Sequence, residues 1–299
     1  MKRKQILVSA SFFYKVEECR YGKVLKVLLE FFVIKHNLNT KLIYDCKVRA
    51  KRIGMLKVKG GLDVSIEVFN RREKKYLIDE EMLGILREEI APYMEADSHN
   101  PDNKTYTISN IYYDTPNNDI ITRSIQKPIY KEKLRLRGYG VPSLNDKVFI
   151  EIKKKYDGVV NKRRSKILLQ DAYEFIKKGR MDILEPYMNE QIIREIEYFL
   201  SVNEIIPALY LAYDRYAYFE KTDSDFRLTF DTNIRTRRYD LGLEFGSQGE
   251  RLLEEGKWIM EIKASNAVPL WFARLLSKYQ LYPVSFSKYG TEFLNSLDI

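Results

Sequence analysis

The chain has 299 residues, of which 45% are hydrophobic and 31% are charged, as in an ordinary folded domain. Its longest apolar stretch, around Val24 to Ile34, is interrupted by Lys26 and Glu30 and falls short of a membrane-spanning helix. Cys19, Cys46 and two histidines are too few for a disulfide framework or a four-thiolate zinc site, and they argue against catalysis by histidine.

The net charge of +9 belongs to the N-terminal segment. Residues 1–54 hold 13 Lys and Arg and 4 Asp and Glu, whereas the charges of the remaining residues balance. We therefore interpret 1–54 as a basic extension of unknown role and 55–299 as the folded domain, with Met55 as an alternative start. Within the extension, Tyr21 to His36 has the pattern of an amphipathic or buried helix.

From Val64 onward, short runs of alternating polarity follow one another, separated by stretches of helical periodicity. The pattern predicts one α+β domain with an antiparallel sheet or barrel, and Pro207 is expected to close a helical region before the last strands. In chain order we predict a strand at Val64 to Ile78, a helix capped by Asp79 and running through Met94, strands at Thr105 to Tyr113, Tyr130 to Tyr139, Lys147 to Lys155 and Val159 to Leu169, helices at Asp171 to Lys178 and Asn189 to Val202, strands at Leu209 to Lys221, Arg227 to Arg237 and Lys257 to Ala264, and a helix from Pro269 to Gln280.

Several of these strands carry charged side chains on one face. Lys133, Arg135 and Arg137 alternate with Leu134 and Leu136, so the cations project to one side of the strand and the leucines to the other. Like charges on neighbouring strands repel and destabilise a sheet, so such an array indicates an anionic partner. The same alternation occurs at Arg71, Glu73 and Lys75, at Glu151, Lys153 and Lys155, at Lys162, Arg164 and Lys166, at Tyr213 and Arg215, and at Glu261 and Lys263.

These runs, in this order, resemble the VTC domain, the polyphosphate polymerase domain of the vacuolar transporter chaperone family. The similarity covers about residues 64 to 290 and does not include residues 1–54. The matching segments are Arg71 to Tyr76, Ser109 to Thr115, Lys133 to Arg137, Glu151 to Lys155, Lys162 to Arg164, Tyr213 to Arg215, Arg227 to Asp231, Glu261 to Lys263 and Phe286 to Tyr289.

The resemblance places the chain among the triphosphate tunnel metalloenzymes, also called CYTH-like proteins. It implies a closed antiparallel β-barrel of about eight strands, with a hydrophilic lumen that forms a triphosphate tunnel. Helices would then cover the apolar residues on the outside of the barrel.

The resemblance also implies a metal-dependent polyphosphate polymerase, a phosphotransferase that moves the γ-phosphate of ATP onto a growing polyphosphate chain. Phosphoryl transfer needs mainly positioning and charge neutralisation, which Lys, Arg and a divalent ion supply. By resemblance, the catalytic residues would be Lys75, Arg135, Arg137, Lys153, Lys162, Arg215, Arg227 and Lys288, and further substrate contacts would come from Lys133, Lys155, Arg164, Lys263 and Tyr213. Mn²⁺ or Mg²⁺ would be held by Glu261, assisted by Glu73 and Glu151, although each of these carboxylates is also a candidate for an ion pair with a neighbouring cation.

One segment departs from the wider superfamily. The Glu-x-Glu-x-Lys motif is replaced here by a sequence in which Arg71 takes the place of the first carboxylate, while Glu73 and Lys75 are kept. This difference favours the polymerase branch over a metal-rich triphosphatase or cyclase. A protein that binds or hydrolyses triphosphate or polyphosphate without polymerising it stays an open alternative.

The expected partners are ATP and inorganic polyphosphate. We expect no nucleic-acid binding, because the 22 Tyr and 15 Phe fall mostly on the apolar side of the alternation. A cytoplasmic protein is expected, and a peripheral position at a membrane with a membrane-associated partner protein is left open, as is the oligomeric state.

Overall fold

A computed structural model describes residues 72–97, 100, 104–157, 159–222, 225–264 and 267–297. They belong to one compact unit, residues 66–299. The predicted extension 1–54 with its helix at Tyr21 to His36, the start of the first predicted strand and Arg71 lie outside the described residues, so these interpretations stay predictions. None of the helices in the described ranges combines the length and apolar character that crossing a membrane requires.

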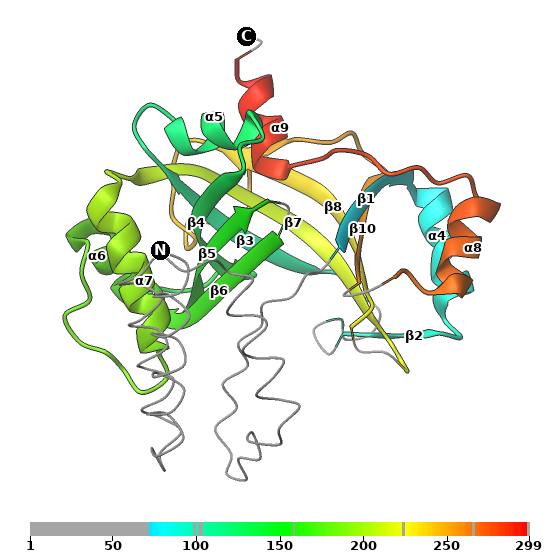
Figure 1. Cartoon of the computed structure of the whole chain (residues 1–299), viewed down its shortest axis with the longest axis horizontal. Helices are drawn as coiled ribbons and strands as arrows, with labels where there is room; N and C mark the ends of the chain where they lie inside the picture. The colour runs from blue at the N-terminus through cyan, green and yellow to red at the C-terminus, as the bar shows by residue number, and fades with distance from the viewer. Residues whose placement is uncertain are drawn as a thin grey trace, which may run out of the picture. The chain divides into compact units, whose positions relative to one another are not determined.

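The described residues form ten strands and six helices (Figure 1). Their bounds are β1 Arg72–Asp79, α4 Glu80–Ile90, β2 Met94–Ala96, β3 Tyr106–Asp114, α5 Asp119–Ile125, β4 Tyr130–Tyr139, β5 Lys147–Tyr156, β6 Val159–Leu168, α6 Leu169–Lys178, α7 Glu190–Val202, β7 Ile206–Glu220, β8 Arg227–Arg237, β9 Glu250–Arg251, β10 Lys257–Ala264, α8 Leu270–Lys278 and α9 Lys288–Asn295.

The predicted strands and long helices are confirmed, with small corrections at their ends. Asp79 caps α4 as expected, since its Oδ1 accepts a hydrogen bond of 2.9 Å from the Met82 amide. However, α4 ends at Ile90, and Met94 begins β2 instead of closing the helix. Pro207 was expected to end a helical region but lies inside β7, next to a register irregularity that accommodates its missing N–H. The short elements β2, β9, α5 and α9 were not predicted.

The strands form one antiparallel sheet with the order β1-β10-β8-β7-β3-β4-β5-β6, to which β2 and β9 add at β7 and β8. The predicted closure into a barrel is wrong for the hydrogen-bonded sheet, because no strand pairing joins β1 to β6 within the described ranges. The free edge of β1 is instead met by Val284, whose amide donates to the Lys75 carbonyl at 2.7 Å. The two sides of the sheet approach through side chains, as Lys153 Nζ of β5 lies 3.9 Å from Glu73 Oε2 of β1.

Two helix pairs cover the outward face of the sheet (Figure 1). Helices α6 and α7 pack on β3 to β6, where Leu134, Leu136 and Ile150 are fully buried. Helices α4 and α8 pack in the same way on β1, β8 and β10, around Phe230 and Met260. The prediction that the apolar alternate positions face outward beneath helices is therefore confirmed for these strands.

The opposite, inward face was expected to be hydrophilic, but it carries an apolar region beside its charged residues. Ile108, Leu209, Leu211 and Ile259 form an apolar cluster there, which α5 and α9 cover. The two helices lie side by side in Figure 1. Ile234 of β8 joins this cluster because the register of β7 and β8 shifts between residues 212 and 214.

Asp114, at the end of β3, joins both covering helices to the sheet. Its carboxylate is fully buried and accepts hydrogen bonds from the amides of Ile120 at 2.8 Å and Ile121 at 2.9 Å in α5. It also accepts a hydrogen bond of 2.9 Å from the hydroxyl of Tyr289 in α9. A single carboxylate thus fixes the positions of two helices.

We predict that Asp114→Asn lowers the free energy of unfolding by about 2–4 kcal/mol, because an amide replaces a charged acceptor and turns donor groups toward buried N–H groups. Urea denaturation measures the loss. Asp182→Asn is the control, since the exposed Asp182 pairs only with exposed cations and its replacement should change stability by less than about 0.5 kcal/mol. Equal stability of the two variants would contradict the role assigned to Asp114.

Candidate functional site

The residues predicted to form the site gather on the inward face of the sheet. Pairing across strands places Arg135 opposite Glu151 and Glu151 opposite Arg164, and paired residues share a face. In the same way Lys75 pairs with Glu261. The predicted residues on this face are Glu73 and Lys75 of β1, Glu261 and Lys263 of β10, Arg227 of β8, Tyr213 and Arg215 of β7, Lys133, Arg135 and Arg137 of β4, Glu151, Lys153 and Lys155 of β5, and Lys162 and Arg164 of β6, with Lys288 at the start of α9.

Glu151 is the centre of the first charge cluster. Its carboxylate lies 2.7 Å from Arg135 Nε, 2.6 Å from Lys162 Nζ and 3.8 Å from Arg137 Nε. Burial alone would raise the pKa of Glu151, but the three cations outweigh it and hold the pKa well below the usual range. Burial lowers the pKa of Lys162, and the two arginines add to the decrease against the attraction of Glu151. One carboxylate therefore offsets three cations only in part.

Two uncharged side chains position the arginines of this cluster. The hydroxyl of Tyr112 accepts a hydrogen bond of 2.9 Å from Arg135 Nη1. Asn110 Oδ1 accepts one of 3.2 Å from Arg137 Nε. These contacts fix each guanidinium in its plane, so the remaining N–H groups are available in a defined direction for a planar or tetrahedral oxyanion.

Asp231 is the centre of the second cluster. It forms a bidentate pair with Arg215, at 2.6 and 2.8 Å, and accepts a hydrogen bond of 2.6 Å from Lys288 Nζ. Burial by itself would raise the pKa of Asp231, but Arg215 and Lys288 reverse the effect and lower the pKa to about 2. Two cations that are remote in sequence are thus tied to the same carboxylate.

Lys75 lies between Glu73 and Glu261 on the neighbouring side of the face. Its Nζ is 3.8 Å from Glu73 Oε1 and 3.9 Å from Glu261 Oε2, and it donates a hydrogen bond of 2.8 Å to the Phe286 carbonyl. Glu261 also pairs with Lys263 at 2.5 Å. Burial lowers the pKa of Lys75, and Lys288 and Lys153 act in the same direction against the attraction of Glu261 and Glu73.

Tyr213 joins the two clusters. Its hydroxyl accepts a long hydrogen bond of 3.4 Å from Arg137 Nη2 of the first cluster. On the other side, Arg215 and Lys288 lie over its ring, at 5.1 and 4.4 Å from the centroid. Burial alone would raise the pKa of Tyr213, but Arg215, Arg137 and Lys288 together bring the net shift downward. The cations of both clusters therefore act on one continuous surface.

The remaining predicted residues lie around these clusters. Arg227 pairs with Asp97 at 3.2 Å and lies over the Phe219 ring, while Arg164 lies over the ring of Phe149. Lys153 contacts only the edge of the site through Glu73, and Lys155 is partly exposed beyond it. These four cations extend the positive surface but do not share a carboxylate with either cluster.

The three predicted metal ligands do not come together. Glu73 and Glu261 both approach Lys75, but Glu151 lies in the other cluster. Among the described residues, no group of three or more His, Cys, Asp or Glu side chains converges to hold an ion. Glu73 and Glu261 nevertheless fit a Mg²⁺ or Mn²⁺ ion that takes its other ligands from phosphate oxygens and water, because such ions often use only one or two carboxylates.

Sequence reasoning missed Asp231, Tyr112 and Asn110. Asp231 lies two and four residues after Thr229 and Arg227 on β8, and it therefore shares their face. This spacing is visible in the sequence, although no role was predicted for Asp231. Tyr112 and Asn110 carry no charge, so nothing in the sequence separated them from other polar strand residues.

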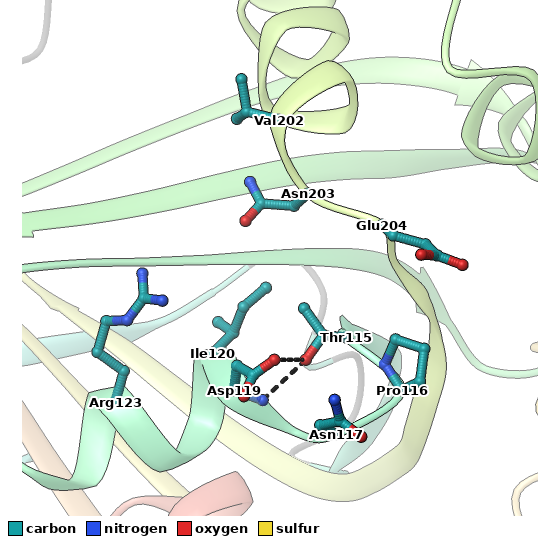
Figure 2. Close-up of a pocket in the computed structure, with 9 residues that line it drawn as sticks. All are labelled: Thr115, Pro116, Asn117, Asp119, Ile120, Arg123, Val202, Asn203 and Glu204. Carbon is teal, nitrogen blue, oxygen red and sulfur yellow. Dashed lines mark hydrogen bonds between the residues drawn. The ribbon is translucent and has the colours of Figure 1, made fainter.

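A separate pocket of about 310 Å³ lies between the β3–α5 turn and the end of α7 (Figure 2). Thr115 and Asp119 hydrogen bond to one another within it, at 2.7 and 2.9 Å. Arg123, Asn203 and Glu204 also line the pocket. None of the predicted site residues lines this pocket, so it is distinct from the charged face.

We predict that Glu151→Gln destabilises the ligand-free protein by about 3–5 kcal/mol, because Arg135, Arg137 and Lys162 then repel one another without an offsetting charge. Bound tripolyphosphate should supply the negative charge that the substitution removes. The ligand-induced rise in Tm should therefore be larger than in the wild type. Glu195→Gln is the control. Glu195 pairs with Lys154 and Arg163 on the outward side, and its loss should leave the ligand-induced shift unchanged. A smaller shift in Glu151→Gln than in the wild type would contradict this role.

We further predict a pH dependence that originates at Lys133. Burial lowers the pKa of Lys133 to about 8, as do the neighbouring Lys131 and Lys153, while Tyr112 and Asp114 oppose the decrease. Since the folded pKa is below the ordinary 10.5, the protonated amine destabilises the fold below about pH 8, and its charge is lost as the pH rises through 8.

Affinity for tripolyphosphate should therefore fall as the pH rises through about 8. Calorimetric titrations between pH 7 and 9 measure the decrease. Lys133→Arg should reduce this decrease because an arginine stays protonated, whereas the outward-facing Lys154→Arg should leave it unchanged. The assignment fails if Lys133→Arg shows the same decrease as the wild type.

Comparison with curated proteins finds no match. Similar solved structures include candidate adenylate cyclases from Bacillus halodurans, at 13% identity and a TM-score of 0.46, and from Vibrio parahaemolyticus, at 12% and 0.40. The match covers 74% of this chain and 94% of the first protein, and 75% and 97% for the second. A candidate adenylyl cyclase from Hippeastrum with a dominant triphosphatase activity is 18% identical with a TM-score of 0.42, over 73% of this chain and 92% of that one. Similarities at this level do not establish a shared function.

The comparison with protein families is decisive. The VTC domain matches residues 70–295, which include every strand and helix described above. The resemblance found in the sequence is thereby confirmed, and the chain belongs to the VTC domain family.

Proposed function

We propose that the inward face binds the phosphates of ATP and of inorganic polyphosphate, and that the protein is a metal-dependent polyphosphate polymerase. The observation that supports this proposal is the excess of cations over carboxylates around Glu151, Asp231 and Tyr213. A phosphate chain would supply the missing negative charge. Membership of the VTC domain family agrees with the proposal.

In the proposed reaction, a terminal oxygen of the polyphosphate chain attacks the γ-phosphorus of ATP. A new P–O bond forms, the bond between the γ-phosphorus and the β–γ bridging oxygen breaks, and ADP leaves with the electron pair. The attacking phosphate is already ionised near neutral pH and needs no general base. Arg135, Arg137 and Arg215 would hold the reacting phosphates in line and neutralise their charge.

The state of the carboxylates favours transfer to phosphate over hydrolysis. Glu151, Asp231 and Glu261 each lie within 4 Å of a Lys or Arg nitrogen, and these cations lower the pKa of each carboxyl. A carboxylate that is ion-paired and has a lowered pKa is a weak base toward water. These residues are therefore better suited to positioning cations than to activating a water molecule.

A divalent ion fits the proposal through Glu261 and Glu73. When bound, Mg²⁺ or Mn²⁺ neutralises charge on the phosphate oxygens and orients them. Glu261 and Glu73 would hold it together with the substrate. Lys75 Nζ, 3.9 and 3.8 Å from these carboxylates, offsets part of their negative charge.

A second candidate function is the binding or slow hydrolysis of triphosphate and polyphosphate without polymerisation. The cations around Glu151 and Asp231 support it, because they would bind a phosphate chain whether or not turnover follows. Incubation of the full chain with ATP and Mn²⁺ or Mg²⁺, followed by gel analysis of polymer and assays of ADP and free phosphate, separates the two. Polymer with equimolar ADP supports the polymerase, and free phosphate without polymer supports hydrolysis.

We predict that the double variant Arg135→Ala/Arg137→Ala loses on the order of a hundredfold or more in affinity for tripolyphosphate, because each charge-assisted contact contributes about 1.5–3 kcal/mol. Calorimetry measures the loss. Arg163→Ala is the control, since Arg163 of the adjacent β6 points outward to Glu195, 3.1 Å away. Unchanged affinity in the double variant would overturn the assignment of the site.

We also predict that Glu261→Gln abolishes metal-dependent turnover and retains ATP binding. The substitution removes a negative charge from a cationic surface, so phosphate affinity should be equal or higher, while the proposed metal ligand is lost. Turnover is measured against Mn²⁺ concentration and ATP binding in its absence. Wild-type turnover with an unaltered Mn²⁺ dependence would show that Glu261 serves only as a counter-ion to Lys263 and Lys75.

A further inference from the structure

Tyr139 continues the row of site residues along β4. It shares the inward face with Arg135 and Arg137, because the three residues lie two positions apart along the strand. At about 3.4 Å per residue, its Cα lies about 7 Å beyond that of Arg137. If the phosphates of a ligand contact the two arginines, the part of the ligand that extends toward the end of β4 lies next to Tyr139.

Two aromatic neighbours hold the ring of Tyr139. The Tyr106 ring of β3 lies 5.9 Å away at a tilt of 44°, and the Phe149 ring of β5 lies 6.3 Å away, nearly perpendicular at 84°. We call these three residues the aromatic row. Tyr139 is nevertheless 40% exposed, and a partly exposed ring with a fixed orientation is a ready stacking surface.

The backbone at this point is also fixed. Gly140 has a positive φ of 64° and donates a hydrogen bond of 2.9 Å to the Thr107 carbonyl. Its own carbonyl accepts a hydrogen bond of 2.5 Å from the hydroxyl of Ser109. The residue after Tyr139 is thus held on β3 by two hydrogen bonds. The backbone next to Tyr139 is therefore ordered before a ligand binds.

Cations flank the aromatic row on both sides. Arg164 of β6 lies 4.5 Å over the Phe149 ring. Arg227 of β8 lies within electrostatic reach of Tyr106 and Tyr139. The row therefore forms an aromatic extension of the cationic face, adjacent to the arginines that would hold the phosphates.

We infer that Tyr139 stacks on the base of a nucleoside triphosphate whose phosphates are held by Arg135 and Arg137. The inference rests on the proposed function and adds to it the residue that contacts the base, a group that bare triphosphate lacks. Every base has a π-face, so the stacking accepts different bases. The base lies at the Tyr139 end of β4, and the phosphates extend toward Arg135.

Calorimetric titration of the full chain with ATP and with tripolyphosphate, both without divalent metal, tests the inference. Tyr139→Ala should weaken ATP binding by about fivefold to a hundredfold and leave tripolyphosphate binding within about twofold. Tyr139→Phe should keep the wild-type ratio of the two affinities, since the π-face is retained. Tyr156→Ala is the control, because this exposed tyrosine ends the neighbouring β5 on the outward side and at the opposite end of the strand pair.

Unfolding curves show whether each variant is folded. Tyr139→Leu, which keeps apolar volume and removes the π-face, is a second test if the alanine variant is unstable, and it should lose ATP affinity selectively as well. Equal weakening of both ligands, or unchanged ATP binding, would overturn the base-stacking role alone. A wild-type protein that binds tripolyphosphate but not ATP would also overturn it, while a wild-type protein that binds neither would overturn the proposed function itself.

Discussion

The repulsion among cations that share one face of the sheet is the constraint on which the rest of the structure depends. Neighbouring strands place Lys133 beside Lys153, and Lys153 beside Lys162. Such pairs destabilise a sheet unless a counter-charge is present. The protein places Glu151 and Asp231, both buried, between groups of cations, which keeps the face folded without neutralising it.

The apolar part of the same face explains how this charge is tolerated. Helices α5 and α9 seal one region of the face over Ile108, Leu209 and Leu211, which supplies the burial that a charged surface cannot. Because Lys288 begins α9, the helix that closes the apolar region also delivers a cation to Asp231. Packing of α9 on the sheet therefore also places Lys288 in the second cluster.

The alternation of charged and apolar residues was sufficient to predict the strands and to separate their side chains into a charged and an apolar face, while the outward position of the apolar face came from the resemblance to the VTC domain. Leu134 and Leu136 oppose Arg135 and Arg137 in the sequence, and the structure buries the leucines beneath helices. The pattern could not indicate closure, because alternation is the same in an open and a closed sheet, and the Val284 contact with β1 is remote in sequence.

The sequence also could not predict which charged residues of the candidate site pair with one another. Strand periodicity places Asp231 on the correct face but does not pair it with Lys288, 57 residues away. The short α5 and α9 escaped prediction because their apolar positions are few and tertiary packing against the sheet stabilises them.

The contact between Val284 and β1 has a consequence for solubility. An open sheet exposes two edges, and an unpaired edge strand is a template for addition of a strand from another molecule. At β1, the Val284 amide already occupies the Lys75 carbonyl, so an incoming strand would have to displace it. At β6, which pairs only with β5 among the described residues, Lys162, Arg164 and Lys166 would bring a second copy into contact with like charge. The cations that suit the face to an anionic ligand thereby also protect the edge of the sheet against self-association.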